Sequence, residues 1–357
     1  MMTCGIIGCG RISPRHIWAV AECYPALRLD YFCDLDITKA IAARERYYGL
    51  LKEKDIPLHE AQVTDQYREL LDKGLDFISL ASDSGSHFTL GMAVLNAGVS
   101  LLVEKPMAMT TVQCDLMIRL ARQNELTLGV CHQNRFNKWV MRLKEAIDAG
   151  KFGELYHGAA TLRWNRDEAY YAQAAWRGKK ESDGGALMNQ GIHNLDLLRW
   201  LLGGKVEEVF GYTANLAHPY IEAEDLAVGV LKFVGNTYAT IEATTSVYPK
   251  NYEETLSIFG KTGSVSLGGV ALEEVRHWAL AGDKDPPPQG QPCHSIGIYG
   301  EGHLPLYLDY IEAVRSKSQP LCDGVEGRDS VELVGALYTS AEQHRRVRLA
   351  TSKGNKA

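Results

Sequence analysis

The sequence predicts an α/β protein with an N-terminal Rossmann doubly wound parallel sheet and a C-terminal α/β domain with a large open, mostly antiparallel sheet. Three observations lead to this fold class. A short apolar strand near the N-terminus runs into a glycine-rich turn, and strand and helix patterns then alternate as far as residue 131. Such alternation is typical of a parallel sheet with right-handed crossovers. From about residue 136, paired strand patterns around short polar turns replace it.

Length and composition bound the class of protein. A chain of 357 residues exceeds one ordinary core, so we expect domains at residues 1–125 and 126–350 and a disordered tail at 351–357. The net charge of −6 lacks the excess of positive charge expected of a protein that binds nucleic acid or an anionic membrane surface. We expect no membrane-spanning helix and no signal segment. The eight cysteines include no C-x-x-C pair, so we expect no metal site, no disulfide framework and a reduced cytoplasm.

The first turn has the pattern of a dinucleotide-binding motif. The strand at residues 3–7 leads into Gly8-Cys9-Gly10-Arg11-Ile12-Ser13, and a helix pattern follows at residues 15–22. Glycines allow a tight turn and the close approach of a pyrophosphate, which the amides at a helix N-terminus can hold. We therefore expect Gly8, Gly10, Arg11 and Ile12 to contact a dinucleotide.

A second strand, at residues 28–33, ends at Asp34, which lies 24 residues beyond Gly10. An acidic residue at this distance accepts a hydrogen bond from the ribose 2′-hydroxyl of NAD and repels the 2′-phosphate of NADP. The sequence thus favours NAD over NADP. In the alternative interpretation, Asp34 or Asp36 caps the helix predicted at residues 37–47.

Further strand ends offer polar side chains to the same edge of the sheet. Ser82 follows the strand at residues 77–81, and His87 opens the next helix. Gln133 and Arg135 follow the strand at residues 126–131. We expect Ser82, His87 and Gln133 to contact the cofactor and Arg135 to contact the substrate, although Ser82 could instead be a helix cap.

The strand predicted at residues 99–103 ends at Glu104-Lys105-Pro106. Because Pro106 cannot donate to a sheet ladder, the strand must end there, and Lys105 would stand at the mouth of a cleft. Burial or a nearby cation could tune this amine for acid–base chemistry. We expect Glu104 to contact the nicotinamide side or to hold Lys105. Alternatively, Glu104 and Lys105 are a solvated pair in a turn.

In the second half, residues 184–203 predict an amphipathic helix with glycines at both ends. Asn189 and His193 lie four residues apart, so we expect them on one helix face, and Asp196 could set the imidazole tautomer. A purely structural histidine is the alternative.

Aromatic and basic residues are interleaved just before this helix. Trp164, Arg166 and Trp176 belong to this stretch. Aromatic faces suit sugar rings and guanidinium groups suit phosphate or carboxylate, so we expect these three residues in the substrate site. In the alternative interpretation, these residues belong to an aromatic-rich strand and loop that pack against the core.

Taken together, the chain resembles the Gfo/Idh/MocA oxidoreductases, the family of glucose–fructose oxidoreductase and inositol dehydrogenase. The resemblance rests on the Gly8-Cys9-Gly10-Arg11-Ile12 turn, on Glu104-Lys105-Pro106, on the Gly184-Gly185 helix with His193, and on the closing stretch at residues 302–311. It implies a Rossmann domain, an open-sheet domain, and homodimers or homotetramers formed through that sheet. It also implies a lysine and a histidine facing the nicotinamide and a substrate carbinol, and Lys105 and His193 match them.

One position departs from the family pattern. Polyol-oxidising members commonly carry aspartate four residues before the histidine, where this chain has Asn189. Because an amide cannot take a proton, Asn189 can only position a hydroxyl, and the base must be His193 or Lys105. Asn189, with the Arg11–His16 stretch, is more similar to the branch that oxidises UDP-linked N-acetylhexosaminuronates at C3.

The resemblance implies an NAD(P)-dependent dehydrogenase that moves a hydride between the carbinol of a sugar, polyol or nucleotide sugar and the nicotinamide. We expect His193 to be the base, with Lys105 bonding the same oxygen. Two alternatives remain open. A sugar hydrolase or epimerase could use NAD as a transient oxidant, and a non-enzymatic regulator could sense the dinucleotide.

Overall fold

The computed structural model describes residues 1–290 and 301–349, and they fall into two compact units. The first unit comprises Met1–Gln133 and His303–Arg328, and the second comprises the rest of the described chain. The contacts therefore assign residues 303–328 to the first unit, whereas the sequence boundaries of 1–125 and 126–350 assign them to the second. The tail at 351–357 lies outside the described residues.

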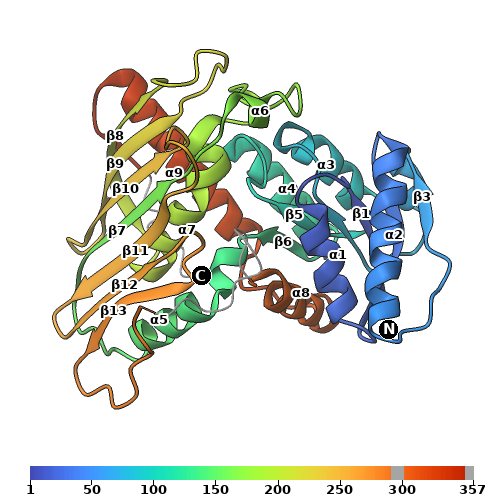
Figure 1. Ribbon diagram of the computed structural model, residues 1–357, viewed down its shortest axis with the longest axis horizontal. Helices are drawn as coiled ribbons and strands as arrows, with labels where there is room; N and C mark the ends of the chain where they lie inside the picture. Colours follow the sequence, from blue (N-terminus) through green and yellow to red (C-terminus); the bar gives the residue numbers. More distant parts are fainter. Residues whose placement is uncertain (291–300, 350–357) are drawn as a thin grey trace. The chain divides into compact units, whose positions relative to one another are not determined.

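The first unit is built on a six-stranded, fully parallel sheet in the order β3-β2-β1-β4-β5-β6. This is the Rossmann order, and it confirms the predicted fold. The strands are nearly all buried because helices lie on both faces, which is why they read as continuous apolar runs (Figure 1). Their bounds are β1 Met2–Ile7, β2 Leu27–Cys33, β3 Gln62–Thr64, β4 Phe77–Leu80, β5 Ser100–Glu104 and β6 Leu128–Cys131.

The helices of this unit begin where the sequence supplies a start signal. Proline stands in the first turn of α1, and Thr110 accepts a hydrogen bond from the Gln113 amide at the start of α4. The last helix, α8, comes from the C-terminal part of the chain and packs against α1 and β6. The helices are α1 Ser13–Glu22, α2 Ile37–Glu53, α3 His87–Asn96, α4 Thr111–Gln123 and α8 His303–Ser316, with short 3₁₀ turns at Tyr67–Leu70 and Ser84–Ser86.

The second unit is built on an eight-stranded sheet in the order β13-β12-β11-β7-β10-β9-β8-β14. Only β7 and β10 run parallel among the described pairs, so the sheet is mostly antiparallel, as predicted. Its strands are β7 Leu155–Arg163, β8 Val206–Ala214, β9 Leu226–Phe233, β10 Tyr238–Thr244, β11 Glu253–Gly260, β12 Gly263–Gly268, β13 Glu274–Leu280 and β14 Val347–Arg348.

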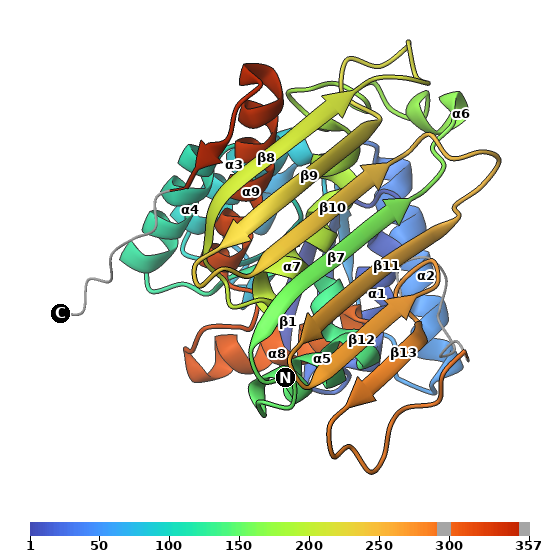
Figure 2. The same cartoon turned by 90° about the vertical axis from the view of Figure 1, so that its left-hand side faces the viewer.

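One face of this sheet is covered and the other is open. Alternate residues such as Ile241 and Leu256 are buried beneath α7 and its neighbours, as the two-residue strand period requires. Figure 2 looks onto the opposite face, which no helix of this unit covers. The helical segments are α5 Lys138–Asp148, α6 Glu168–Tyr171, a π-helix η4 Ala186–Gly191, α7 Ile192–Leu201 and α9 Gly324–Gln343, with a 3₁₀ turn at Gln133–Phe136.

None of the helices within residues 1–290 and 301–349 is long and apolar enough to cross a membrane. Seven cysteines are described, and all seven are buried and outside any disulfide.

Candidate active site

The glycine-rich turn of the first unit is shaped to admit a phosphate. Gly8 has φ +95°, and a Cβ there would lie 2.4 Å from the backbone of Ala81 and Ser82, so only glycine fits. A Cβ at Gly10 would meet nothing within 4 Å, which leaves open space beside the turn. Ile12, the residue before α1, makes no side-chain cap. The Ser13 and Arg15 amides donate to the Gly10 and Ile12 carbonyls, and Pro14 between them has no N–H. The turn therefore fits a dinucleotide pyrophosphate, while the contacts of exposed Arg11 and of Ile12 with it stay predictions.

Asp34 closes the same turn. One oxygen of its carboxylate accepts a hydrogen bond from the Cys9 amide at 2.8 Å, and the other accepts one from the Asp36 amide at 2.9 Å. Asp36, not Asp34, caps α2, because its side chain accepts from the Thr38 amide. Of the two alternatives that the sequence left open, the helix cap is therefore Asp36, and Asp34 remains the candidate for the ribose contact. A carboxylate held beside the glycine turn fits the ribose of NAD better than the extra phosphate of NADP.

Ser82 and His87 form part of the framework that joins two strand ends. One ring nitrogen of His87 faces the Pro106 carbonyl at 2.8 Å and the other faces the Ser82 carbonyl at 3.2 Å. The Ser82 hydroxyl bonds Ser86 at 2.8 Å. His87 is buried, and burial lowers its pKa. Both ring nitrogens face backbone carbonyls, and a neutral imidazole can donate to only one of them, so the contact of His87 with the cofactor stays a prediction.

Glu104 and Lys105 lie at the end of β5, but the carboxylate of Glu104 faces the interior of the unit. It is 5% exposed, and Nε2 of His16 lies 3.1 Å from Oε1. The Lys105 amide donates to Oε2 at 3.2 Å. The contact between the Lys105 amide and Glu104 supports the alternative in which Glu104 holds Lys105, through the Lys105 backbone. A contact of Glu104 with the nicotinamide stays a prediction. Lys105 itself is half-buried.

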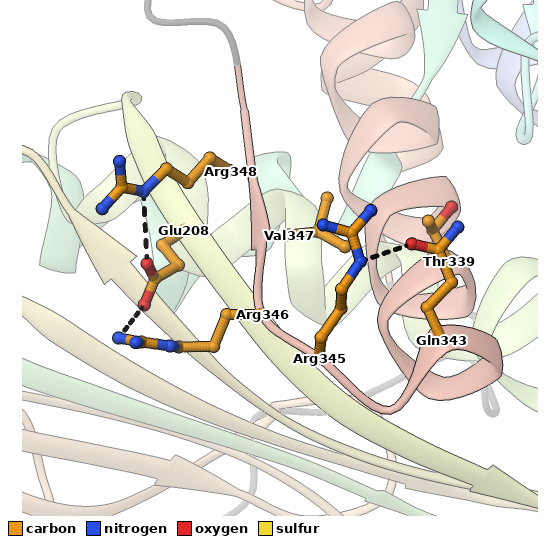
Figure 3. Close-up of a pocket in the computed structure, with 7 residues that line it drawn as sticks. All are labelled: Glu208, Thr339, Gln343, Arg345, Arg346, Val347 and Arg348. Carbon is orange, nitrogen blue, oxygen red and sulfur yellow. Dashed lines mark hydrogen bonds and ion pairs between the residues drawn. The ribbon is translucent and has the colours of Figure 1, made fainter.

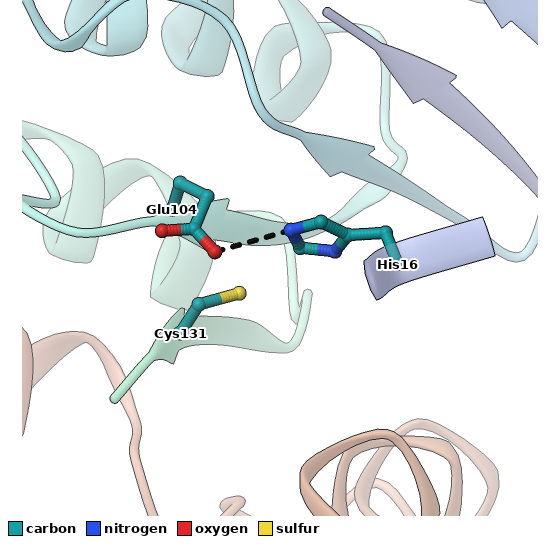
Figure 4. Close-up of side chains that lie close together, drawn as sticks. All are labelled: His16, Glu104 and Cys131. Atoms are coloured by element: carbon teal, nitrogen blue, oxygen red, sulfur yellow. Dashed lines mark hydrogen bonds and ion pairs between the residues drawn. The ribbon is translucent and has the colours of Figure 1, made fainter. Parts of the chain in front are cut away.

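His16, Glu104 and Cys131 form the buried cluster drawn in Figure 4, in which each offers one ligand-type atom within 4.8 Å of the others. The other nitrogen of His16 lies 2.8 Å from the Tyr307 hydroxyl and 3.1 Å from Ser79 Oγ. Burial, followed by the charge of Glu104, raises the pKa of the Cys131 thiol well above its usual range. A protonated thiol and a hydrogen-bonded imidazole make this a hydrogen-bonded cluster. Sequence reasoning missed it, although a histidine and a tyrosine four residues apart at 303 and 307 are a signal on one helix face.

Gln133 and Arg135 follow β6 in a short 3₁₀ turn. Gln133 is buried, and its contact with the cofactor stays a prediction. Arg135 is completely buried, and its Nε and Nη2 donate to the two oxygens of Asp196 at 2.7 and 2.6 Å. The ring of Trp200 lies beneath the guanidinium, 5.0 Å away. The two guanidinium nitrogens that could bind an anionic substrate side by side already donate to Asp196. This corrects the expected substrate role of Arg135.

The segment that carries Asn189 and His193 is not one regular helix. A π-helix at Ala186–Gly191 precedes α7 at Ile192–Leu201, which corrects the predicted continuous α-helix. Gly185 starts the segment with φ +80°, and a Cβ there would lie 2.0 Å from the carboxylate of Glu224. π-Helical turns inside helices are frequent at functional sites. Asn189 and His193 are each 9% exposed.

Two acidic residues anchor the start of this segment. Nδ2 of Asn189 donates to Asp183, and Nε2 of Gln190 donates to Oδ1 of Asn189. Glu224 accepts hydrogen bonds from the Leu187 amide at 2.8 Å and from the Tyr338 hydroxyl at 2.9 Å. Burial raises the pKa of Glu224 to about 7. The Asn189 amide is thereby fixed in one orientation by its neighbours, with its nitrogen on a carboxylate.

The aromatic and basic residues before the π-helix form a stack of rings and guanidinium groups. Arg166 lies 4.8 Å from the ring centre of Trp164 and 5.0 Å from that of Tyr170. Arg177 lies 4.3 Å from Tyr170 and 4.5 Å from Trp176. The structure thus brings the three predicted residues together and adds Tyr170 and Arg177. Arg166 also donates to Gln190 at 3.4 Å, which ties the stack to the Asn189 segment.

A separate hollow lies where α9 and β14 meet β8 (Figure 3). Glu208 pairs there with Arg346 at 3.3 Å and with Arg348 at 3.7 Å, and the arginines are largely exposed. None of the predicted site residues lines this hollow. Its lining residues are Glu208, Thr339, Gln343, Arg345, Arg346, Val347 and Arg348.

Comparisons with known proteins agree with both units. Residues 2–132 match the model of the oxidoreductase family with an NAD-binding Rossmann fold, and residues 140–266 match that of the GFO/IDH/MocA C-terminal domain. Myo-inositol 2-dehydrogenase of Thermotoga maritima is 26% identical over 352 residues, which cover 98% of each chain. The WlbA dehydrogenase from Bordetella pertussis, solved with NADH and UDP-GlcNAcA, is 35% identical with a TM-score of 0.83 and 98% coverage of each chain. WlbA from Chromobacterium violaceum, solved with the same ligands, is 33% identical with a TM-score of 0.84, covering 98% of this chain and 96% of the other.

Proposed function

Because the chain belongs to the GFO/IDH/MocA family, and so is an NAD-dependent oxidoreductase of sugar, polyol or nucleotide-sugar carbinols, we propose that it oxidises a UDP-linked N-acetylhexosaminuronate at C3. One observation carries this choice of substrate. The likeness to the WlbA dehydrogenase solved with NADH and UDP-GlcNAcA extends over 98% of each chain at 35% identity. The inositol dehydrogenase from Thermotoga maritima is 26% identical over the same extent.

Asn189 also supports a nucleotide sugar over a polyol. A polyol-oxidising site of this family commonly has a carboxylate there, and the amide of Asn189 can only donate or accept a hydrogen bond. Its nitrogen donates to Asp183 and its oxygen accepts from Gln190, and in this proposal the oxygen also accepts a hydrogen bond from a substrate hydroxyl. Asn189 thus positions a hydroxyl and takes no proton.

The first unit supplies the cofactor site. Gly8 and Gly10 make room for the pyrophosphate in the turn before α1. Asp34 is placed for the ribose hydroxyls, with Arg11, Ile12, Ser82 and Gln133 as further contacts. NAD, when bound, supplies the acceptor for the hydride that leaves the sugar carbon.

The catalytic groups in this proposal are Lys105 and His193. The imidazole of His193 takes the proton of the substrate hydroxyl, and Lys105 donates a hydrogen bond to the same oxygen as negative charge develops on it. Lys105 stands at the end of β5 in the first unit, and His193 stands in the first turn of α7 in the second.

The stack of Trp164, Arg166, Tyr170, Trp176 and Arg177 is our candidate for the anionic part of the substrate. Aromatic faces pack against sugar or base rings, and guanidinium groups pair with carboxylate or phosphate. Nη1 of Arg177 donates a hydrogen bond to a neutral group, the Tyr170 hydroxyl, at 2.6 Å. A guanidinium held by aromatic faces is ready to accept a carboxylate partner.

The open face of the second sheet is our candidate for assembly. Large apolar side chains stand exposed on it, among them Tyr212, Val228, Val230 and Tyr238. A contiguous exposed apolar surface of this kind marks an interaction site. We propose a homodimer or homotetramer formed through this sheet, and a cytoplasmic enzyme, since none of the described cysteines is in a disulfide.

The test is to follow NADH formation with purified protein against a panel of UDP-sugars, free uronates, hexoses and inositols. We expect turnover with UDP-linked N-acetylhexosaminuronates and a markedly higher kcat/KM than with inositols. A preference for free inositol would overturn the substrate assignment. Product formation without NADH accumulation would instead indicate that NAD serves as a transient oxidant.

A further inference from the structure

Asn189 belongs to a chain of hydrogen bonds in the second unit that begins at a guanidinium group and ends at a carboxylate. Arg166, which follows β7, donates from Nη2 to Oε1 of Gln190 at 3.4 Å. Nε2 of Gln190 donates to Oδ1 of Asn189. Nδ2 of Asn189 in turn donates to Oδ1 of Asp183, in the turn before the π-helix. Every hydrogen bond of this Arg166–Asp183 chain therefore points the same way.

The two ends of the chain decide how both amides are oriented. A carboxylate only accepts hydrogen bonds and a guanidinium group only donates them, whereas an amide can be turned over to exchange its oxygen and nitrogen. If Asn189 were turned over, its oxygen would face the carboxylate of Asp183 and its nitrogen would face that of Gln190. If Gln190 were turned over as well, its nitrogen would face Arg166. Both alternatives set like groups against each other, so only the observed orientation satisfies the whole chain.

The carboxylate end of the chain is itself fixed. Oδ2 of Asp183 accepts a hydrogen bond from the Gly178 amide at 2.6 Å, and the Asp183 amide donates to the Lys179 carbonyl at 2.9 Å. Asp183 is 2% exposed and Asn189 is 9% exposed, so water cannot readily replace a hydrogen bond that is lost here. Because a backbone amide cannot be turned over, Gly178 keeps an oxygen of residue 183 on its own side.

We propose that Asp183 is a positioning residue that makes the oxygen of Asn189, and not its nitrogen, face a substrate hydroxyl. A carbonyl oxygen can accept two hydrogen bonds, so acceptance from Gln190 is compatible with acceptance from the sugar. The hydroxyl that Asn189 orients is a neighbour of the reacting one, because the reacting hydroxyl has a single proton and gives it to His193. The inference rests on the proposed function, in which Asn189 and His193 face the substrate.

The direction of the chain is tested by reversing it. Asp183→Asn sets an NH₂ group against the nitrogen of Asn189, because the Gly178 amide holds the oxygen of the new side chain. Gln190→Glu sets a carboxylate against the oxygen of Asn189. We expect each to lower Tm by about 3–8 °C. In Asp183→Asn/Gln190→Glu, Asn189 can turn over and satisfy both new neighbours, and the carboxylate still accepts from Arg166. Its Tm should return to within about 2 °C of that of the unmodified protein.

Activity separates positioning from a purely structural role. Asp183→Asn/Gln190→Glu leaves the nitrogen of Asn189 facing the substrate, so we expect kcat/KM for UDP-GlcNAcA to stay about 10–100-fold low even though Tm recovers. Asp183→Asn/Asn189→Asp is the matched control. It has the same net charge and also satisfies the chain, but it presents an oxygen to the substrate, so it should regain most of the lost kcat/KM.

Two outcomes would overturn the proposal. Equal kcat/KM in the two double variants would show that the orientation of the Asn189 amide does not matter to the reaction. Additive losses of Tm in Asp183→Asn/Gln190→Glu would show that the residues do not form one chain. Since Tm is measured without substrate, it decides the second point even if the unmodified protein fails to oxidise UDP-GlcNAcA, a failure that would contradict the proposed function instead.

A further measurement needs no substitution. Neutron diffraction from a deuterated crystal of the unmodified protein locates the deuterons of side-chain amides, which distinguishes nitrogen from oxygen directly. We expect both amide deuterons of Asn189 on the atom next to Asp183. Deuterons on the atom next to Gln190 would overturn the assignment of Asp183.

Discussion

The guanidinium of Arg135 and the carboxylate of Asp196 form a doubly hydrogen-bonded ion pair with no solvent access, across 61 positions of the chain. The pair joins the 3₁₀ turn after β6 to α7, and Ser330 adds a hydrogen bond to Asp196 at 2.9 Å. It therefore fixes the helix that carries His193.

We expect Arg135→Met or Asp196→Leu alone to lower the free energy of unfolding by about 3–5 kcal/mol, because each leaves an uncompensated buried charge. The double variant Arg135→Met/Asp196→Leu should regain most of the loss. Urea unfolding of the four proteins measures this. Additive losses in the double variant would show that the two residues do not act as a pair.

Lys105→Ala and His193→Ala should each lower kcat by roughly 10²–10⁴-fold while NAD still binds, because each removes a group that acts on the substrate hydroxyl. Steady-state kinetics and NADH fluorescence titration provide the two readouts. Lys261→Ala and His277→Ala are matched controls, since Lys261 is exposed in the turn between β11 and β12 and His277 is exposed on β13. Full turnover in either active-site variant would refute its assignment.

Asp34→Ser should shift the ratio of kcat/KM for NAD over NADP by about 10–100-fold toward NADP, because a charged hydrogen-bond acceptor is lost at the ribose. The control is Asp36→Ala, which removes the cap of α2. It should cost about 1 kcal/mol of stability and leave the cofactor ratio unchanged. An unchanged ratio in Asp34→Ser would contradict the predicted ribose contact.

Gly185→Ala should impair activity as well as stability, because the added Cβ meets the Glu224 carboxylate at the start of the π-helix. Gly235→Ala is the matched control. It also has positive φ, +94°, but its Cβ would meet nothing within 4 Å, so only backbone strain of about 1–3 kcal/mol applies. Thermal unfolding and turnover of both variants distinguish the steric clash with Glu224 from backbone strain. Equal losses of stability and activity in the two variants would argue against the clash.

Glu254 gives the second unit a pH-dependent stability. Burial raises its pKa from 4.5 to about 8, so the folded state binds more protons than the unfolded state between these values, and stability falls as pH rises through this range. Glu254→Gln should flatten that slope in urea unfolding at about pH 5–8. Glu242→Gln should not, because the hydrogen bond from Arg163 lowers the pKa of Glu242 and its contribution is lost only at lower pH. A slope unchanged in Glu254→Gln would count against the shift.

Local pattern was enough to predict the alternating elements of the first unit. Apolar strands, the Gly8–Gly10 turn and the helix starts are specified by neighbours within a few positions, and the alternation of strands and helices was enough to predict a parallel sheet, though not its strand order. The three-residue strand β3 was missed because it is too short to show a period.

The errors at the site share one cause, which is a partner far away in the chain. His16 and Tyr307 are 291 positions apart, and Asp196 lies 61 positions beyond Arg135, so no local pattern could show that Glu104 and Arg135 face interior partners. The π-helix likewise depends on Glu224 and Tyr338, which lie outside its own sequence. The sequence could identify side chains with suitable chemistry, but not which of them are bonded to other residues of the protein.

The return of α8 to the first unit bears on how this protein can be dissected. Tyr310 from α8 packs its ring 5.1 Å from that of Phe77, and its hydroxyl donates to the Thr127 carbonyl at 3.1 Å. Gly129 in β6 has no side chain because the same tyrosine fills that space. An expressed fragment that stopped after β6 would lack the contacts of α8. The nucleotide-binding unit is built from residues 1–133 and 303–328, so a single cut in the chain cannot separate it from the other unit.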